Sequence, residues 1–355
     1  MDRLKRLCEA LEEGQGMLIT SAENRFYLTG LRSSAGTLAV TREESVLFID
    51  FRYFEMARRV EQAHGFRTVL LKKEDRQLRE FFSSHGVHTL YAEPGSLSVS
   101  RFETYRAALP ELHLTRDSRM EHAVLKLREC KDETEQSLIA QAQRITDAAF
   151  SSILGFIRPG VTEKQIAAEL EYRMKQEGAD GFAFDTIALS GPNTALPHGQ
   201  PSDRPVQPGE FVLMDFGASV GGYQSDMTRT VAVGSADPLM KEVYATVLRA
   251  QRAALAMLRP GVQCCMADKT ARDMIEAGFP DTFGHSLGHS LGVEIHEGPT
   301  LSPTCERTLK PGMIVTVEPG IYLTGRFGVR IEDFVQITVD GIRNFTRSEK
   351  ELLVL

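Results

Sequence analysis

The sequence predicts an α/β protein of two domains, and three observations carry that prediction. The chain has 355 residues, which favours two domains at about 150 residues each. Over about the first 120 residues, short apolar runs alternate with charged, amphipathic stretches. The rest of the chain contains two copies of one sequence pattern, about 100 residues apart. We therefore place one domain at residues 1–122 and a second at residues 123–355.

The first domain is predicted as strands alternating with helices. Residues 46–49, 69–71 and 89–91 are apolar runs of strand length, and the charged segments between them are predicted as helices. This alternation is typical of a sheet covered by helices. A charged stretch at residues 128–133 then opens a long predicted helix. Its apolar residues recur every three or four positions, at Leu138, Ala142, Ile145, Ala149 and Ile153.

An internal repeat organises the second domain. Residues 158–161 (Arg-Pro-Gly-Val) separate two helical segments, and the same four residues recur at 259–262. A capping box over residues 162–165 starts the second helix of the first copy. Each copy continues with a Pro-Gly turn and an apolar strand that ends in a carboxylate, at Asp215 and at Glu318. The repeat predicts a pseudo-twofold domain in which these two strand ends meet at a central cleft.

Four carboxylates and one histidine form a candidate metal site. They are Asp215, Asp226, His289, Glu318 and Glu332. Asp226 precedes a predicted strand at 228–233, and Glu332 lies in an alternating run at 329–335 that is predicted as a strand. A single such residue is usually a turn or core residue, but so many carboxylates cannot converge without cations. The set suits two divalent ions about 3.5–4 Å apart, and its oxygen-rich character favours manganese.

A histidine cluster at residues 285–296 adds to this site. His285 and His289 have the spacing of a zincin motif, but Ser286 stands where that chemistry needs glutamate. Neighbouring glycines disfavour a helix, and alternation over residues 293–297, which include His296, predicts a strand.

Composition excludes several classes of function. The formal charge of −7 gives no electrostatic reason to bind nucleic acid or an anionic membrane. No apolar run approaches the ~18 residues of a membrane span, and the charged N-terminus does not resemble a signal peptide. Five cysteines without a C-x-x-C motif predict free thiols and a cytoplasmic protein.

These motifs resemble those of the Xaa-Pro peptidases, which are relatives of prolidase, creatinase and methionine aminopeptidase. The resemblance covers nearly the whole chain. In the second domain it rests on seven ordered motifs, at residues 184–187, 196–199, 214–217, 225–230, 288–292, 317–322 and 328–333. In the first domain, residues 24–30 and 50–53 match typical motifs. The resemblance implies a creatinase-like N-terminal domain followed by a pita-bread metallopeptidase domain, and a homodimer.

The resemblance also implies roles for the metal ligands. Asp215 would bind one of two metal ions, and His289 and Glu318 would bind the other. Asp226 and Glu332 would bridge the two ions. Glu318 would also carry a proton from the attacking water to the leaving proline nitrogen. Manganese is the expected metal, with cobalt, zinc or iron as alternatives.

Further residues would contact the substrate. By resemblance, His198 and His296 are outer histidines that stabilise the developing oxyanion. His285, Tyr322 and Arg330 would shape the pocket for proline. A purely structural role for His285 stays open, because a motif match is only a hypothesis.

The expected function is an Xaa-Pro aminopeptidase acting on proline-containing peptides, with an Xaa-Pro dipeptidase as the alternative. Dipeptidase members often carry an arginine shortly after the position of His296, where it binds the dipeptide carboxylate. Residues 297–304 contain no arginine, and the nearest is Arg307, although Arg330 could serve. A creatinase-like amidinohydrolase and a non-catalytic pita-bread binding module are weaker alternatives, because all five metal ligands are present.

Overall fold

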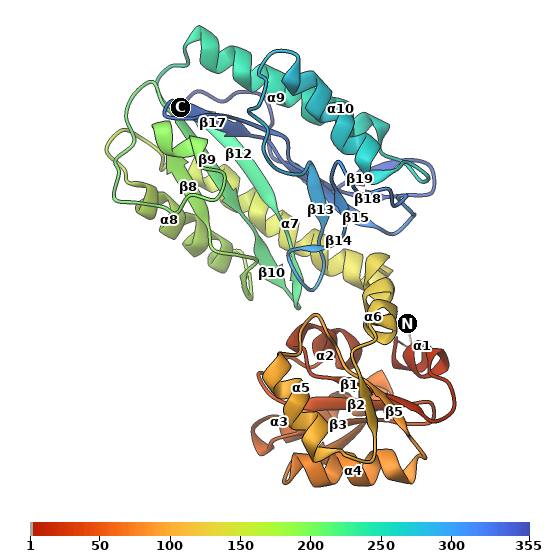
Figure 1. Ribbon diagram of the computed structural model, residues 1–355. Helices are drawn as coiled ribbons and strands as arrows, with labels where there is room; N and C mark the ends of the chain where they lie inside the picture. The colour runs from red at the N-terminus through yellow and green to blue at the C-terminus, as the bar shows by residue number, and fades with distance from the viewer. Residues whose placement is uncertain (1–2) are drawn as a thin grey trace. The chain divides into compact units, whose positions relative to one another are not determined.

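Figure 1 shows the computed structural model of the protein, in which residues 3–355 are described. The chain divides into two units, the first ending at Arg128 and the second running Glu129–Leu355. The boundary expected between residues 122 and 123 falls inside helix α6 (Arg119–Glu129). Among residues 3–355, no helix is both long and apolar enough to span a membrane.

The first unit is built on a six-stranded mixed sheet in the order β4-β3-β2-β1-β5-β6. Its strands are β1 (Gln15–Ile19), β2 (Thr37–Thr41), β3 (Ser45–Ile49), β4 (Arg67–Leu70), β5 (Thr89–Tyr91) and β6 (His113–Thr115). Its other helices are α1 (Arg3–Ala10), α2 (Ala22–Thr29), α3 (Phe51–His64), α4 (Glu74–Ser84) and α5 (Val99–Ala108). The three apolar runs predicted as strands form β3, β4 and β5.

The first half of the second unit packs two helices on a sheet. The helices are α7 (Glu133–Ile153) and α8 (Glu163–Gln176), and the predicted capping box of Thr162 and Gln165 is present at the start of α8. The sheet has the order β12-β9-β8, from β8 (Ile187–Ser190), β9 (Phe211–Phe216) and β12 (Met227–Ala232). A second small sheet joins β7 (Gly181–Phe182), β10 (Ala218–Val220) and β11 (Tyr223–Gln224). The 3₁₀ helix Gly191–Ala195 follows β8.

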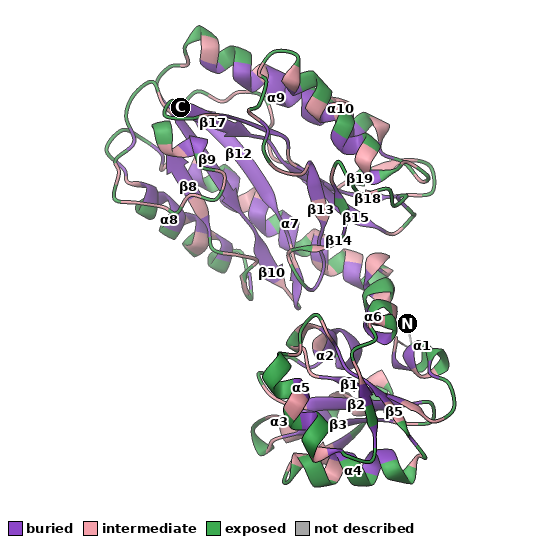
Figure 2. Cartoon of the chain, viewed as in Figure 1, coloured by how far each residue is buried: buried purple, intermediate pink, exposed green. Residues whose placement is uncertain are grey.

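The second half repeats this order of elements. Helices α9 (Pro238–Met257) and α10 (Cys264–Glu276) precede a five-stranded sheet in the order β14-β13-β15-β18-β19. Its strands are β13 (Gly288–Ser290), β14 (Glu297–Leu301), β15 (Ile314–Val317), β18 (Asp333–Ile337) and β19 (Ile342–Asn344). Strands β16 (Gly320–Leu323) and β17 (Phe327–Arg330) form a hairpin. In each half, the inner faces of the helices are buried and their outer faces exposed (Figure 2).

Two predicted strands are wrong in detail. The run at 329–335 is split into β17 and β18, because β17 pairs with β16 whereas β18 pairs with β15. Glu332 lies in the break, where its backbone N–H donates to the carbonyl of Thr228 at 3.1 Å. Residues 291–296 form a loop instead of a strand, closed by a bond from the N–H of Gly292 to the carbonyl of Glu294. Alternating apolar residues therefore did not ensure a paired strand at either place.

Candidate metal and peptide site

A cavity of about 690 Å³ lies in the second unit and draws its lining from both halves of the repeat. All residues predicted for the site line this cavity, with the exception of Tyr322. The lining residues among them are Asp215, Asp226, Glu318, Glu332, His198, His285, His289, His296 and Arg330. Tyr322 lies behind this lining, where its hydroxyl contacts Nε2 of His285 at 2.8 Å.

The ends of paired strands position the carboxylates. Asp215 is near the end of β9, opposite Thr228 of β12, and Asp226 immediately precedes β12. In the other half, Glu318 immediately follows β15, and Glu332 immediately precedes β18. The pseudo-twofold order of elements thus brings two carboxylates from each half to one cavity.

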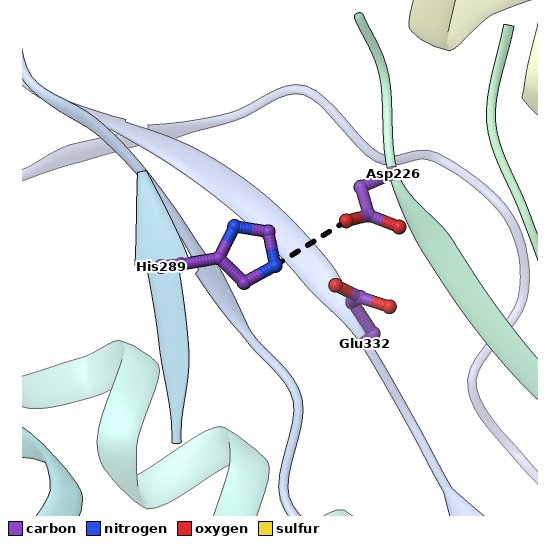
Figure 3. A group of neighbouring side chains, drawn as sticks. All are labelled: Asp226, His289 and Glu332. Atoms are coloured by element: carbon purple, nitrogen blue, oxygen red, sulfur yellow. Dashed lines mark ion pairs between the residues drawn. The ribbon is translucent and has the colours of Figure 1, made fainter. Parts of the chain in front are cut away.

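Asp226, His289 and Glu332 form the tightest group of possible metal ligands. One ligand atom from each lies within 4.8 Å of the others, and the three side chains point toward one another in Figure 3. Nε2 of His289 lies 3.6 Å from Asp226 and 3.4 Å from Glu318. Nδ1 of the same ring lies 3.1 Å from the carbonyl of Ser290, so a proton on Nδ1 leaves the Nε2 lone pair facing the carboxylates.

The buried charges of this group repel one another. Burial, together with the charges of Asp215 and Glu318, raises the pKa of Asp226 well above its ordinary range. Burial and neighbouring carboxylates raise the pKa of Glu332 in the same way, and they raise that of Glu318 to about 8. Burial lowers the pKa of His289 to about 4, with a smaller effect from His296. The group therefore lacks positive charge that a cation would supply.

The donor set fits a divalent metal ion. Asp215 Oδ1 and Glu332 Oε1 are buried and have no hydrogen-bond partner. The other oxygen of each carboxylate is held, by Arg330 Nη2 at 2.6 Å from Asp215 and by the Thr228 hydroxyl at 2.7 Å from Glu332. Unpartnered buried oxygens are rare in proteins, and carboxylate oxygens with one imidazole are suitable ligands for divalent cations.

Arg330 lines the cavity and is held there by four hydrogen bonds. It is buried, and besides Asp215 its guanidinium donates to the hydroxyls of Thr228 and Tyr322, both at 2.9 Å, and to the carbonyl of Pro197 at 3.3 Å. A guanidinium has five N–H donors, and these contacts use four of them. Arg330 therefore fixes Asp215 and Tyr322, and it is poorly placed to bind a substrate carboxylate as well.

The outer histidines surround the carboxylates. The ring of His296 packs edge-to-face on His289, with centroids 4.5 Å apart, and His198 lines the cavity next to Pro197. Burial and the nearby Arg330 lower the pKa of His285 to about 4, so this ring is neutral at pH 7. Both ring nitrogens of His285 are engaged within the protein, Nδ1 with the Ser286 carbonyl at 2.9 Å and Nε2 with the Tyr322 hydroxyl at 2.8 Å. His198 and His296 are therefore the imidazoles that could donate hydrogen bonds beside the candidate metal ligands.

Sequence reasoning gave no site role to three residues that support or adjoin the cavity. The Thr228 hydroxyl connects Glu332 to Arg330, although Thr228 lies inside one of the motifs used above. Lys131 reaches Glu297 in the cavity wall from the charged stretch at 128–133, which had been interpreted only as a helix start. Arg307 lies beside Gly298, another lining residue, with Nη1 3.2 Å from the position that a Cβ would occupy there. Only tertiary structure reveals these contacts.

Comparison with known proteins identifies the family. Residues 137–339 match the model of metallopeptidase family M24, and residues 1–130 match the creatinase/prolidase N-terminal domain. The chain belongs to metallopeptidase family M24. An Xaa-Pro dipeptidase of Pyrococcus furiosus is 37% identical over 99% of both chains.

Solved structures of M24 peptidases share the fold throughout. An Xaa-Pro dipeptidase from Bacillus anthracis has a TM-score of 0.94 and 39% identity, covering 100% of this chain and 99% of the other. An X-Pro aminopeptidase from Thermotoga maritima has a TM-score of 0.91 and 36% identity, covering 100% of both. The expected creatinase-like domain and pita-bread domain are therefore confirmed. Membership of M24 also implies divalent metal ions and metallo-exopeptidase activity.

Proposed function

We propose that this M24 peptidase is an Xaa-Pro dipeptidase, a prolidase. The observation that carries the proposal is the convergence of four carboxylates and His289 in one cavity with three further histidines. The full-length relatives named Xaa-Pro dipeptidase support the dipeptide as substrate, which favours the alternative over the aminopeptidase expected from the sequence. The Thermotoga maritima structure keeps the aminopeptidase as the second candidate.

The metal ligands are assigned as follows. Asp215 would hold one divalent ion, His289 and Glu318 would hold the second, and Asp226 and Glu332 would lie between the two. The unpartnered oxygens of Asp215 and Glu332 support this assignment. The carboxylate-rich donor set favours manganese. Ions held there would lower the pKa of a water molecule and polarise the scissile carbonyl.

The remaining chemistry belongs to side chains of this chain. Glu318 is held by the Thr316 hydroxyl at 3.2 Å, and it can accept a proton from the attacking water and return it to the proline nitrogen as that group leaves. His296 and His198 line the cavity and would donate hydrogen bonds to the carbonyl oxygen as negative charge develops on it. His285, supported by Tyr322 and Arg330, forms the wall assigned to the proline ring.

The absence of arginine from residues 297–304 does not leave the cavity wall without a cation. Gly298 and Thr300 line the cavity, and the Arg307 guanidinium lies beside Gly298 in an ion pair with Glu129. Arg307 would therefore supply positive charge beside β14 although it comes later in the sequence. This placement weakens the argument for an aminopeptidase.

Two broader assignments belong to the proposal. None of the five cysteines forms a disulfide within residues 3–355, which supports a cytoplasmic location. A homodimer is proposed from the resemblance to the family.

The test is a comparison of substrates. Metal-loaded protein is assayed with an Xaa-Pro dipeptide, its C-terminal amide and an Xaa-Pro-Yaa tripeptide. A dipeptidase gives the highest kcat/KM with the free dipeptide and a much lower value with the amide, which has the same shape but no carboxylate. Preference for the tripeptide would overturn the proposal in favour of the aminopeptidase.

A further inference from the structure

A buried lysine reaches the cavity wall from the start of the second unit. The Lys131 side chain is 1% exposed, and its Nζ lies 3.0 Å from Glu297 Oε2, whose side chain is 5% exposed. The same ammonium donates to the buried hydroxyl of Ser290 at 3.1 Å. An ammonium is costly to bury unless its partners are well placed, so this geometry is maintained by specific contacts.

The two partners of Lys131 directly follow two histidines of the cavity. Ser290 follows His289 at the end of β13, and Glu297 follows His296 at the start of β14. Between them the chain loops over residues 291–296 without strand pairing. Lys131 therefore joins the two ends of the segment on which both rings depend.

The loop is packed closely around this contact. Glu297 Oε1 accepts the backbone N–H of Glu294 at 3.1 Å, so one carboxylate both closes the loop and pairs with Lys131. A Cβ on Gly292 would lie 2.8 Å from the Glu297 oxygens and 2.9 Å from Lys131 Cε. The Gly292 backbone therefore packs directly against the Lys131–Glu297 ion pair.

Lys131 is itself fixed by its backbone. Its N–H donates to the carbonyl of Gly312 at 2.8 Å, and its carbonyl accepts a bond from Gln136 Nε2 at 2.7 Å. Asp132, the next residue, is the N-cap of α7 in a complete capping box. The ammonium thus extends from a rigid helix start, which makes it a firm support for the loop.

We propose that Lys131 is a positioning residue that holds the His296 imidazole against the reacting carbonyl, acting through Glu297 and Ser290. This inference rests on the proposed function, which assigns His296 to oxyanion stabilisation. Lys131 itself does not line the cavity.

A double-mutant cycle tests the proposal. Lys131→Met is measured in the wild-type background and in His296→Ala, with an Xaa-Pro dipeptide and saturating metal. We expect kcat to fall by about tenfold or more in the wild-type background, with KM changed less, because a small misplacement of a catalytic group is costly. In the His296→Ala background we expect Lys131→Met to lower kcat by less than threefold, since the group being positioned is gone.

The controls separate positioning from stability. Arg204→Met removes an ion pair with Glu210 outside the cavity lining, and it is expected to lower the thermal midpoint without changing kcat. If Lys131→Met fails to fold, Glu297→Gln breaks the same ion pair with a side chain of nearly the same shape and replaces it in the cycle. Equal losses of kcat in both backgrounds would overturn the proposal. Wild-type protein without Xaa-Pro hydrolysis would instead refute the proposed function.

Discussion

At the scale of single residues, three cavity carboxylates share one arrangement. Arg330 holds one oxygen of Asp215, Thr228 holds one of Glu332, and Thr316 holds one of Glu318. For Asp215 and Glu332, the other oxygen has no partner. Contacts behind the ligands fix their orientation before a metal binds, which is how outer contacts tune metal sites.

The variants Asp226→Asn and His198→Ala distinguish a metal ligand from a residue that contacts only the substrate. Asp226 lies within 4.8 Å of His289 and Glu332, so its loss should lower bound metal below two ions per chain. His198→Ala should keep its metal and lose about 10²-fold in kcat/KM, the scale for one positioned group. Elemental analysis of both purified variants, alongside kinetics, checks this. Loss of metal from His198→Ala would contradict the assignment of His198.

Thr300→Arg tests recognition of the dipeptide carboxylate. Thr300 lines the cavity whereas Thr304 does not, so Thr304→Arg is the matched control. An arginine at Thr300 should raise the ratio of kcat/KM for dipeptide over tripeptide, tenfold for each ~1.4 kcal/mol of added interaction. The same substitution at Thr304 should leave the ratio unchanged. Equal changes in both variants would show that the effect is only one of net charge.

At the scale of elements, each half of the second unit uses a glycine to bring two ligand-bearing segments together. A Cβ on Gly217 would lie 1.9 Å from the carbonyl oxygen of Ser225, which precedes Asp226. A Cβ on Gly288, which precedes His289, would lie 2.1 Å from the carbonyl oxygen of Thr316. These close backbone approaches set the spacing of the candidate metal ligands.

Gly217→Ala and Gly288→Ala should each destabilise the protein and weaken metal binding. A methyl group in either place must displace a backbone carbonyl, and such overpacking costs about 1–3 kcal/mol or more. Gly278→Ala is the control, because nothing lies within 4 Å of its Cβ position. Chemical denaturation and metal titration of the three variants check this. Retention of wild-type metal affinity in both cavity variants would contradict the role given to these contacts.

The repeat made the strand-end ligands predictable, because Asp215 and Glu318 end equivalent apolar strands. Local pattern could not predict the break before Glu332, which arises because successive strands pair with different partners. It also could not predict the contact of Lys131 with Glu297, since that pairing depends on how distant segments fold together. Sequence reasoning therefore predicted which carboxylates meet in the cavity better than it predicted the contacts that support them.

At the scale of the whole molecule, metal binding is coupled to pH and stability. Burial raises the pKa of Glu318 to about 8, from an ordinary value of 4.5, and shifts Asp226 and Glu332 in the same direction. A carboxyl whose pKa is raised by folding stabilises the fold at low pH, and this contribution is lost as pH rises toward 8. Metal binding, which requires ionised carboxylates, should therefore strengthen over the same range.

Calorimetry of chelator-stripped protein checks this coupling. The thermal midpoint should fall between about pH 6.5 and pH 8, through loss of the contribution just described; below that range the lowered pKa values of His285 and His289, about 4, act in the opposite direction. Saturating divalent metal should raise the midpoint more at pH 8 than at pH 6. An equal or larger increase at pH 6 would show that the carboxylates are not the groups that metal binding deprotonates.

The most direct test of the account is a metal titration followed by Xaa-Pro hydrolysis. Protein stripped of metal, as verified by elemental analysis, is titrated with Mn²⁺ while bound metal and turnover of an Xaa-Pro dipeptide are measured together. Four carboxylates and His289 in one cavity predict no turnover at the start and a plateau at two ions per chain. Undiminished turnover in protein shown to contain no metal would contradict the account.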